Sequence, residues 1–454
     1  MHSLIPKRIR LTPMQILAIG FAAVILIGAC LLKLPISSKN GISTPFIDCF
    51  FTSTSAVCVT GLVTVDTGTH WSYFGKTVIM FLIETGGLGF MSLAALMSLL
   101  LGKRITLRDR LIMQESMNSF TLQGIVRMAK YVLTFTFIVE GVCAGLMATQ
   151  FVPKFGIVKG FYYSVFHSVS AFCNAGFDIL GTPGNEYISL TQKGYYDNPI
   201  IILTIGFLII AGGLGFSVWQ EIYEERNIKN LSLHSKLVLT VTAILVFGGA
   251  FLMFIFEMKN PGTIKNMTPK GKVLSSIFAS ITPRTAGFNS ISTADMTPAG
   301  RFLTIILMFI GGSPGSTAGG IKTATFGLLV ITVVSVIRGR EDAEIFKKRI
   351  GKDTVYKALS ITLISLTLVI VVTMILSITE AGASLEYILY EATSAFGTVG
   401  LTLGLTTKLT VIGKVIISFT MYAGRVGPLT LACALASKTR KDSIKYPEDR
   451  ILVG

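Results

Sequence analysis

Charged residues are scarce in this chain. Only 14% of its 454 residues are Asp, Glu, Lys or Arg, whereas 51% are hydrophobic, and the mean hydropathy is +0.68. Several apolar runs exceed the roughly 18 residues that mark a membrane-spanning helix. The composition therefore excludes an ordinary soluble protein and predicts an all-α integral membrane protein.

Cysteine and histidine are also few, and no chemical site follows from their spacing. The six cysteines form no CxxC or CxxH pattern, and the four histidines are scattered, which excludes a zinc cluster or a disulfide framework. The stretch 315–323 resembles a phosphate-binding loop, but Ile321 interrupts the required Gly-Lys-Thr. With no catalytic triad either, we expect no enzyme and no organic cofactor.

The formal net charge of +16 would suit nucleic acid, but no basic face carries interleaved aromatic residues, so we expect no such partner. Basic loops instead fix the orientation of a membrane protein. Of the 40 Lys and Arg residues, 24 lie in five segments, and so do 12 of the 15 arginines: the N-terminus, 102–130, 221–236, 338–357 and 438–450. We predict that this side is cytoplasmic and holds both termini.

The N-terminal apolar run has two interpretations. It follows Lys7, Arg8 and Arg10 and ends near a lipoprotein-like box at 27–30, as a signal peptide would. We favour a first transmembrane helix after a short cytoplasmic tail, because the repeat described next requires that helix.

One short pattern occurs four times at nearly even intervals. It is Val59-Thr60-Gly61-Leu62, Asn174-Ala175-Gly176-Phe177, Thr285-Ala286-Gly287-Phe288 and Thr398-Val399-Gly400-Leu401, and its glycines are 115, 111 and 113 residues apart. A short apolar run precedes each copy and a long one follows. We therefore predict four pseudo-symmetric helix–pore loop–helix repeats around one central pore.

The apolar runs give the expected boundaries. We expect first helices at about 13–34, 131–151, 237–256 and 358–378, and second helices at about 78–101, 200–219, 302–337 and 411–436. Between them lie runs at about 46–56, 161–171, 274–281 and 387–395, which are too short to cross a bilayer of about 30 Å. The units are a tail at 1–12, repeats at 13–101, 124–222, 235–337 and 354–436, and a tail at 437–454.

The four loops suit a cation. Backbone that is not helical survives at membrane depth only where it is buried or lines a water-filled cavity, and glycine allows the positive φ angles that turn carbonyls inward. Carbonyl rings coordinate dehydrated cations, and the C-terminal end of each short helix adds partial negative charge. Ordinary turns would explain one such loop but not four in register. Because the loops are uncharged, we predict a filter for a monovalent cation, made of Val59, Thr60, Gly61, Asn174, Ala175, Gly176, Thr285, Ala286, Gly287, Thr398, Val399 and Gly400.

Three longer stretches carry a family resemblance: 55–62 (SAVCVTGL), 282–289 (TPRTAGFN) and 394–401 (SAFGTVGL). On these residues the chain resembles the Trk, Ktr and HKT superfamily of potassium transporters over nearly its whole length, and most closely the Ktr membrane subunit. The resemblance implies that the four glycines lie in a selectivity filter that favours K⁺. It also implies Na⁺ as a permeant or activating ion.

The second helix of repeat 3 contains an unusual interruption. The run 302–337 would be about 54 Å long if helical, but its middle is rich in proline and glycine, which are poor helix formers. We predict two half-helices joined by a gate loop below the filter, made of Gly311, Gly312, Ser313, Pro314, Gly315, Ser316, Thr317, Ala318, Gly319 and Gly320.

Arg425 stands alone in an apolar helix, where an arginine costs about 2.5–3.5 kcal/mol on insertion scales. When the glycine pairs are aligned, it lies at the depth of the loop 311–320. We predict that Arg425 raises a barrier to cations and holds the loop through its carbonyls; a structural anchor is the alternative. The resemblance implies that this arginine and this loop form an intramembrane gate.

The matching places in the other repeats are the glycine-rich stretches 86–89, 212–215 and 424–427. For the first two we favour close helix packing over hinges, so that only repeat 3 has a strongly broken helix. The shared orientation of the repeats and this single break disfavour the alternative function, an ion-coupled carrier for an organic solute, because carriers use inverted repeats with matching breaks.

Four ionisable residues within apolar runs have open roles. Glu84, Glu140 and Glu391 are carboxylates at membrane depth, and Lys322 follows the gate loop. For Glu391 we favour hydrogen bonds to loop amides over a purely electrostatic role. Lys322 either snorkels or pairs with a carboxylate.

The partners follow from the resemblance and from the basic loops. The resemblance implies a homodimer in the plasma membrane of a bacterium, a symporter or a channel, regulated by a separate cytosolic ring that binds ATP and ADP. The basic connections 102–130 and 338–357 would dock that subunit, and lipid headgroups are the alternative partner for the same charges.

Overall fold

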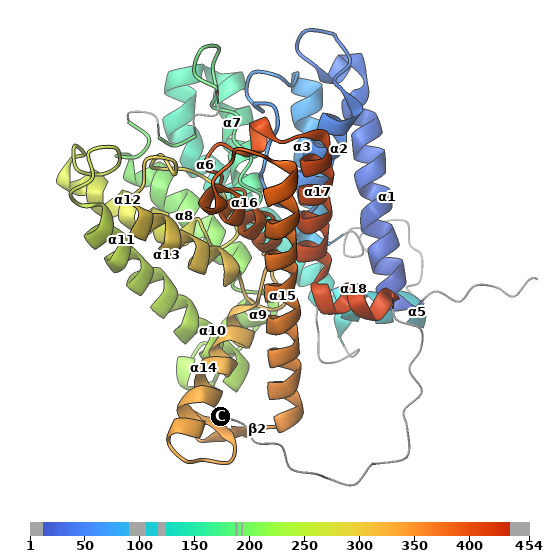
Figure 1. Ribbon diagram of the computed structural model, residues 1–454, viewed down its shortest axis with the longest axis vertical. Helices are drawn as coiled ribbons and strands as arrows, with labels where there is room; N and C mark the ends of the chain where they lie inside the picture. The colour runs from blue at the N-terminus through green and yellow to red at the C-terminus, as the bar shows by residue number, and fades with distance from the viewer. Residues whose placement is uncertain (1–11, 90–105, 117–123, 187–188, 192–193, 436–454) are drawn as a thin grey trace, which may run out of the picture.

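The computed structural model describes residues 12–89, 106–116, 124–186, 189–191 and 194–435. Within these ranges the chain is almost entirely helical, and its only strands form one small antiparallel hairpin, β1 (Ala343–Ile345) and β2 (Lys348–Ile350) (Figure 1). Most of both predicted tails, and the end of the second helix of repeat 1, lie outside the described residues.

The first helix of each repeat is long and apolar enough to cross a membrane, as predicted. These helices are α1 (Pro13–Lys33), α6 (Ile125–Phe155), the continuous helix Leu233–Glu257 and α15 (Lys352–Thr379). The third consists of α10 (Leu233–Ala243), a π-helical turn η3 (Ile244–Gly248) and α11 (Gly249–Glu257). The last three start four to six residues before the predicted positions. The prediction followed the apolar residues, and these helices begin with a polar turn, such as that at Lys352.

A short helix follows in every repeat: α2 (Phe46–Val57), α7 (Ile157–Phe172), α12 (Pro269–Ile281) and α16 (Leu385–Gly397). Their second halves are almost fully buried. Local chemistry fixes their starts. In α12, for example, the hydroxyl of Thr268 accepts a bond from Gly271 N at 3.0 Å and Pro269 fills the first helical position.

The second helices begin alike and stop early. They are α3 (Tyr73–Leu88), α8 (Pro199–Gly213), the pair α13 (Pro298–Phe309) and α14 (Thr323–Ile337), and α17 (Val411–Val426). Polar side chains cap their starts at Ser72, Asn198, Thr297 and Thr410. None of them is long enough to cross a membrane as one unbroken helix. The expectation of an unbroken second helix in repeats 1, 2 and 4 is therefore wrong in the described ranges, whereas the predicted break in repeat 3 is present.

Short elements complete the chain. They are η1 (Pro35–Ser37), α5 (Leu107–Ser116), α9 (Phe216–Glu225), η2 (Ile228–Asn230), η4 (Thr406–Lys408) and α18 (Pro428–Leu435). Both α5 and α18 pack against α1, near its N-terminal end in the view of Figure 1.

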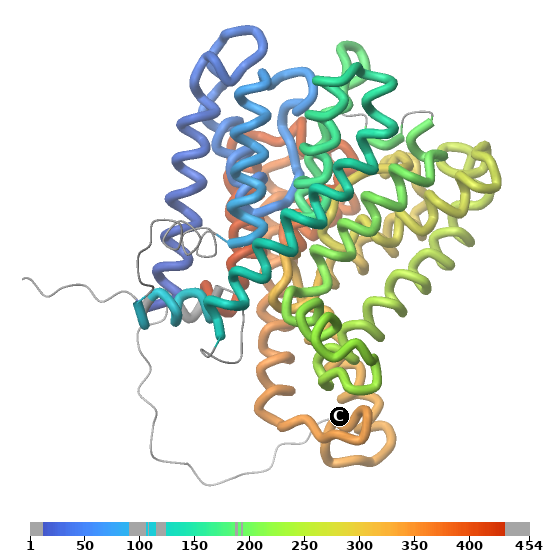
Figure 2. The backbone as a smooth tube through the Cα atoms, turned by 180° about the vertical axis from the view of Figure 1, so that it is seen from behind, coloured from blue at the N-terminus to red at the C-terminus, as the bar shows by residue number. Residues whose placement is uncertain are grey.

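The helices close into a ring in which every repeat touches the next in the same way. The second helix of each repeat packs against the short helix of the following one: α3 on α7, α8 on α12, α13 on α16 and, to close the ring, α17 on α2. This arrangement confirms four pseudo-symmetric repeats around one axis. In Figure 2 the four repeats follow the colour order of the tube, from blue to red.

Buried glutamates join the first and second helices within two repeats. Glu257, at the end of α11, is fully buried and accepts bonds from the amide and hydroxyl of Thr297 at 2.9 and 2.8 Å. Glu380, just after α15, accepts bonds from the amide and hydroxyl of Thr410 at 3.1 and 2.7 Å. Each carboxylate thus fixes the start of a second helix against the end of the first.

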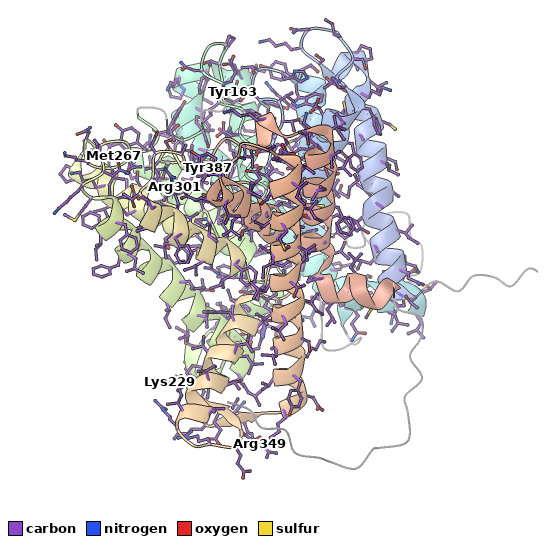
Figure 3. All side chains as sticks on the ribbon, in the orientation of Figure 1. Tyr163, Lys229, Met267, Arg301, Arg349 and Tyr387 are labelled. Carbon is purple, nitrogen blue, oxygen red and sulfur yellow. The ribbon has the colours of Figure 1, made fainter. Side chains whose placement is uncertain are left out.

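Two of the basic segments lie at one end of the molecule. Lys229 and Arg349, from two segments predicted to be cytoplasmic, lie at the same lower end in Figure 3, and Tyr163 of the short helix α7 lies near the opposite end. The hairpin β1–β2, the end of α14 and the first turns of α15 form the lower end of the molecule (Figures 1 and 2).

Candidate ion pathway

The four predicted filter glycines meet one another around the axis. A Cβ atom on Gly61 would strike the carbonyl oxygen of Ala175, and one on Gly176 would strike that of Ala286. In the same way Gly287 faces the carbonyl of Val399, and Gly400 faces that of Thr60. The contacts run from repeat 1 to 2, 3, 4 and back to 1. No side chain larger than hydrogen fits at these four positions.

The backbone of each loop alternates in handedness. The first residue of each motif, Val59, Asn174, Thr285 or Thr398, has a positive φ between 50° and 72°, and each glycine has one between 67° and 91°. The residue between them does not. These four account for most of the non-glycine residues with positive φ in the described ranges. Such a conformation costs about 1–2 kcal/mol per residue, and a fourfold occurrence of strain indicates a functional backbone.

Hydroxyl residues at the ends of the short helices hold the loops in place. Ser55 Oγ accepts a bond from Gly61 N at 3.0 Å, and Ser394 Oγ accepts one from Gly400 N at 3.1 Å. In the other two repeats, Ser170 and Thr282 donate to the carbonyls of Phe177 and Phe288 at 2.8 and 2.7 Å. These four residues were not predicted from the sequence, although a hydroxyl five or six positions before each glycine was a detectable signal.

Several polar atoms at the filter are buried and have no partner in the described part of the chain. They are the hydroxyls of Thr60, Thr285 and Thr398. A buried hydroxyl normally finds a hydrogen bond, so these oxygens are available to a ligand in the pathway. Together with the strained backbone they form a site that can replace the hydration shell of a cation.

The second helices break at the level just below the filter. In three repeats the break falls on the last glycine of the glycine-rich stretch: Gly89, Gly215 and Gly427 have φ of 78°, 91° and 93° and ψ of 128°, 135° and 129°. After Gly215 the chain turns by 95° into α9. The expectation that only repeat 3 is strongly broken is therefore wrong, because a glycine with positive φ ends a helix without a long insertion.

The same stretches also pack closely, as expected for the first two. A Cβ on Gly86 would strike the carbonyl of Val57, one on Gly212 that of Phe172, and one on Gly424 that of Phe396. Each of these carbonyls belongs to the C-terminal turn of a short helix. Within one four-residue stretch, glycine therefore both allows close packing and ends the helix, so the two explanations are not alternatives.

In repeat 3, the segment between α13 and α14 crosses under the filter and rests on repeat 2. Its ends are joined by a bond from Gly311 N to Ile321 O at 2.8 Å. Ser313 N donates to Gly213 O at 2.8 Å, and Phe216 N donates to Gly315 O at 3.0 Å. The loop is thus held by the broken backbone of the α8–α9 turn.

The loop lies directly against the filter. A Cβ on Gly319 would strike the side chain of Thr398, and one on Gly311 would lie 3.3 Å from the Cγ2 of Thr285. The predicted gate residues and the first filter positions therefore form one continuous site.

Arg425 connects this loop with the remaining repeats. Its Nη1 donates to the carbonyl of Thr317 in repeat 3, and its Nη2 donates to Gly86 O and, at 3.0 Å, to Gly87 O in repeat 1. A guanidinium supplies five donors in a rigid fork, so one side chain from repeat 4 bridges two others. The predicted contact with loop carbonyls is present, and the contacts with repeat 1 were not foreseen.

A cavity of about 470 Å³ opens beneath the loop. Its lining comes from the break points and from the first turns of α1 and α15, and includes Met14, Gly89, Phe216, Lys322, Lys357 and Arg425. Since the N-terminal turns of the first helices lie at the end with the basic segments, the cavity is a vestibule on that side of the loop. Three cationic side chains line it.

Two of the four ionisable residues with open roles, Glu391 and Lys322, have specific partners. Glu391 is fully buried and accepts bonds from the hydroxyls of Thr402, at 2.7 Å, and Thr406. The expectation that Glu391 accepts hydrogen bonds from loop amides is wrong, because the segment after the fourth loop presents the hydroxyls of Thr402 and Thr406 to this carboxylate. Lys322 donates to the carbonyl of Ala318 at 2.5 Å, so it ties the end of the gate loop and does not pair with a carboxylate in the described ranges.

Residues 7–445 match the protein family TrkH, described as cation transport protein. Two relatives match over essentially their whole length. The potassium/sodium uptake protein NtpJ of Enterococcus hirae is 43% identical over 459 residues, covering 100% of both chains. The Ktr system potassium uptake protein B of Bacillus subtilis is 43% identical over 448 residues, covering 99% of this chain and 98% of the relative.

The fold has a counterpart among solved structures. The crystal structure of the potassium transporter TrkH from Vibrio parahaemolyticus superposes with a TM-score of 0.73 at 18% identity, covering 95% of this chain and 86% of that one. The helix–loop–helix architecture therefore extends to sequences that have diverged widely.

Proposed function

The chain belongs to the TrkH family of cation transport proteins, and from this premise we propose that it is a K⁺ uptake protein in which dehydrated K⁺ passes along the axis of the four-repeat ring. The observation that carries the proposal is the closed ring of glycines, each of which packs on the carbonyl before the next glycine. Rings of carbonyls are the standard means by which proteins bind K⁺. The relatives named as potassium uptake proteins support the choice of ion.

We assign the filter to Val59, Thr60, Gly61, Asn174, Ala175, Gly176, Thr285, Ala286, Gly287, Thr398, Val399 and Gly400. The alternating handedness of these loops and the unpartnered hydroxyls among them support this assignment. Since no carboxylate belongs to the filter, a monovalent cation is favoured over a divalent one. The name of the Enterococcus hirae relative supports Na⁺ as a second permeant ion.

The gate in this proposal is the loop 311–320 together with Arg425. The loop lies across the axis under the filter and is bonded to repeats 2 and 4. The guanidinium places a positive charge at the top of the vestibule, where it opposes the entry of a cation. Opening requires the loop to leave the axis, and every bond that holds it is a hydrogen bond of modest net strength.

One of the two arguments against the carrier alternative does not hold. The second helices break at matching positions, so a single broken helix no longer distinguishes this chain from a carrier. All repeats nevertheless share one orientation, and a closed fourfold ring leaves the axis as the pathway. The names of the relatives also point to inorganic cations.

The proposal places the basic end of the molecule in the cytoplasm and the filter near the outer surface. A bacterial plasma membrane, a homodimer and a separate cytosolic nucleotide-binding ring complete it. The relative named as part of a Ktr system supports a further subunit, and the projecting basic hairpin β1–β2 offers it a docking place. The mass of the purified protein would test the dimer, which should be twice 49.0 kDa.

The decisive test is Rb⁺ uptake into proteoliposomes loaded with K⁺. We expect uptake that external K⁺ competes for strongly and Na⁺ weakly, measured for the chain alone and with its cytosolic partner. Empty liposomes and the variant Gly287→Ala serve as controls. Absence of Rb⁺ uptake under both conditions, or counterflow of an organic solute instead, would contradict the proposal.

A further inference from the structure

A cluster of three potential metal ligands lies behind the filter of repeat 2, outside the pathway. Glu84 on α3, Glu140 on α6 and Cys173 at the end of α7 each place one oxygen or sulfur atom within 4.8 Å of the others. The cluster joins three helices from two repeats. Cys173 directly precedes the filter residue Asn174.

The cluster is short of positive charge. Within the described residues neither carboxylate forms an ion pair with Lys or Arg. The guanidinium of Arg425 donates its hydrogen bonds to backbone carbonyls instead. Glu140 is only 5% exposed, and its Oε1 has no hydrogen-bond partner in these ranges. Two neighbouring carboxylates at membrane depth need a cation or a shared proton.

The ligand set selects the kind of cation. The Sγ of Cys173 lies 3.4 Å from Glu84 Oε2, and two ligands of a tetrahedral Zn²⁺ site, at about 2.3 Å for sulfur and 2.0 Å for oxygen, lie about 3.5 Å apart. Alkali cations have no preference for a thiolate, whereas borderline and soft divalent ions do. Glu84 is partly buried, whereas Glu140 and Cys173 are buried.

We propose that Glu84, Glu140 and Cys173 bind a thiophilic divalent cation such as Zn²⁺ or Cd²⁺, and that this binding inhibits transport. Binding releases the thiol proton and any proton on the carboxylates. The ion would fix α3, α6 and the filter of repeat 2 to one another. Cys173 also packs on Gly87, whose carbonyl is bonded to Arg425, so the gate and the filter share this junction.

Binding can be measured without transport, so its failure is distinguishable from failure of the proposed function. Purified protein is titrated with Cd²⁺ while the thiolate-to-cadmium charge-transfer absorbance is followed. We expect one equivalent to be lost in Cys173→Ser. In Glu140→Gln its affinity should fall by at least about tenfold, since even outer partners of a metal ligand contribute that much.

The matched control is Cys58→Ser. Cys58 is the buried counterpart of Cys173 in repeat 1, directly before Val59, and it is not part of the cluster. This variant should keep both the Cd²⁺ equivalent and the inhibition of Rb⁺ uptake by Zn²⁺, whereas Cys173→Ser should lose both. Equal Cd²⁺ binding in wild type and Cys173→Ser would overturn the proposal. A Glu140→Gln protein with unchanged affinity would also overturn it, since the carboxylates would then only share a proton.

Discussion

Arg425 of repeat 4 donates a hydrogen bond to the carbonyl oxygen of Thr317 in repeat 3, and this bond joins the one charged side chain of α17's last turn to the loop beneath the filter. The same guanidinium also holds the glycine pair of repeat 1. One side chain therefore couples three repeats at a single depth. Its removal would free the loop and also remove a positive charge from the pathway.

Replacement of Arg425 by alanine should increase Rb⁺ flux in the absence of the cytosolic partner by about tenfold, since hydrogen bonds from a charged group contribute about 1.5–3 kcal/mol. The variant Arg425→Lys separates the two roles. Lysine keeps the charge but lacks the planar fork that reaches several carbonyls, so a flux near wild type would assign the barrier to charge alone. Unaltered flux in Arg425→Ala would rule out the gating role.

Replacement of Gly287 by alanine should abolish the preference for K⁺ over Na⁺. The new Cβ would strike the carbonyl of Val399, and the residue has a φ of 85°, where alanine is disfavoured by about 1–2 kcal/mol. The control is Gly141→Ala in α6, where a Cβ meets no atom within 4 Å. Competition between Rb⁺ and Na⁺ in proteoliposomes measures the effect, and equal selectivity in both variants would mean that the ring does not select.

Replacement of Ser394 by alanine should weaken the filter of repeat 4, because the amide of Gly400 would lose its acceptor. A buried donor left without a partner costs about 1–3 kcal/mol. Ser418→Ala on α17 is the control, because the buried hydroxyl of Ser418 has no partner among the described residues. We expect a lower K⁺ affinity in the first variant only, and equal affinities would disprove the supporting role.

Replacement of Glu257 by glutamine should lower the melting temperature in detergent without changing ion selectivity. This buried carboxylate accepts bonds from Thr297, Thr263 and Asn260, and an amide group would turn donors toward donors, at a cost of about 1–3 kcal/mol. Glu386→Gln is the comparison. Its carboxylate is 40% exposed and pairs with Arg301, so its loss should cost less than about 1 kcal/mol. A larger shift in Glu386→Gln than in Glu257→Gln would contradict this account.

The repeat pattern and the positions of the four loops could be predicted from the sequence because they depend on local chemistry. Glycine at four evenly spaced positions and short apolar runs identified the loops and the short helices. The break of the helix around 311–320 could also be predicted, since ten residues rich in Gly and Ser cannot form an apolar span. These features need no knowledge of what lies across the axis.

The relations between repeats could not be read in the same way. A single glycine such as Gly215 can pack within a helix or end it, and only the neighbouring Pro314 and Gly315 backbone decides between them. The partners of Glu391 depend on where Thr402 and Thr406 fall after the filter. The residues Glu84, Glu140 and Cys173 come from three separate helices, so their spacing in the sequence does not predict that they form a cluster.

The contact between Gly400 and Thr60 closes the ring, and it has a consequence for biosynthesis. Thr60 is synthesised early and Gly400 late, and chains fold from the N-terminus as they are made. A nascent chain with only three repeats lacks one side of the glycine ring, and its loop 311–320 has no arginine to hold it. A sealed, selective pore can exist only after the fourth repeat is inserted, so premature termination should give a polypeptide for degradation and not an unregulated leak.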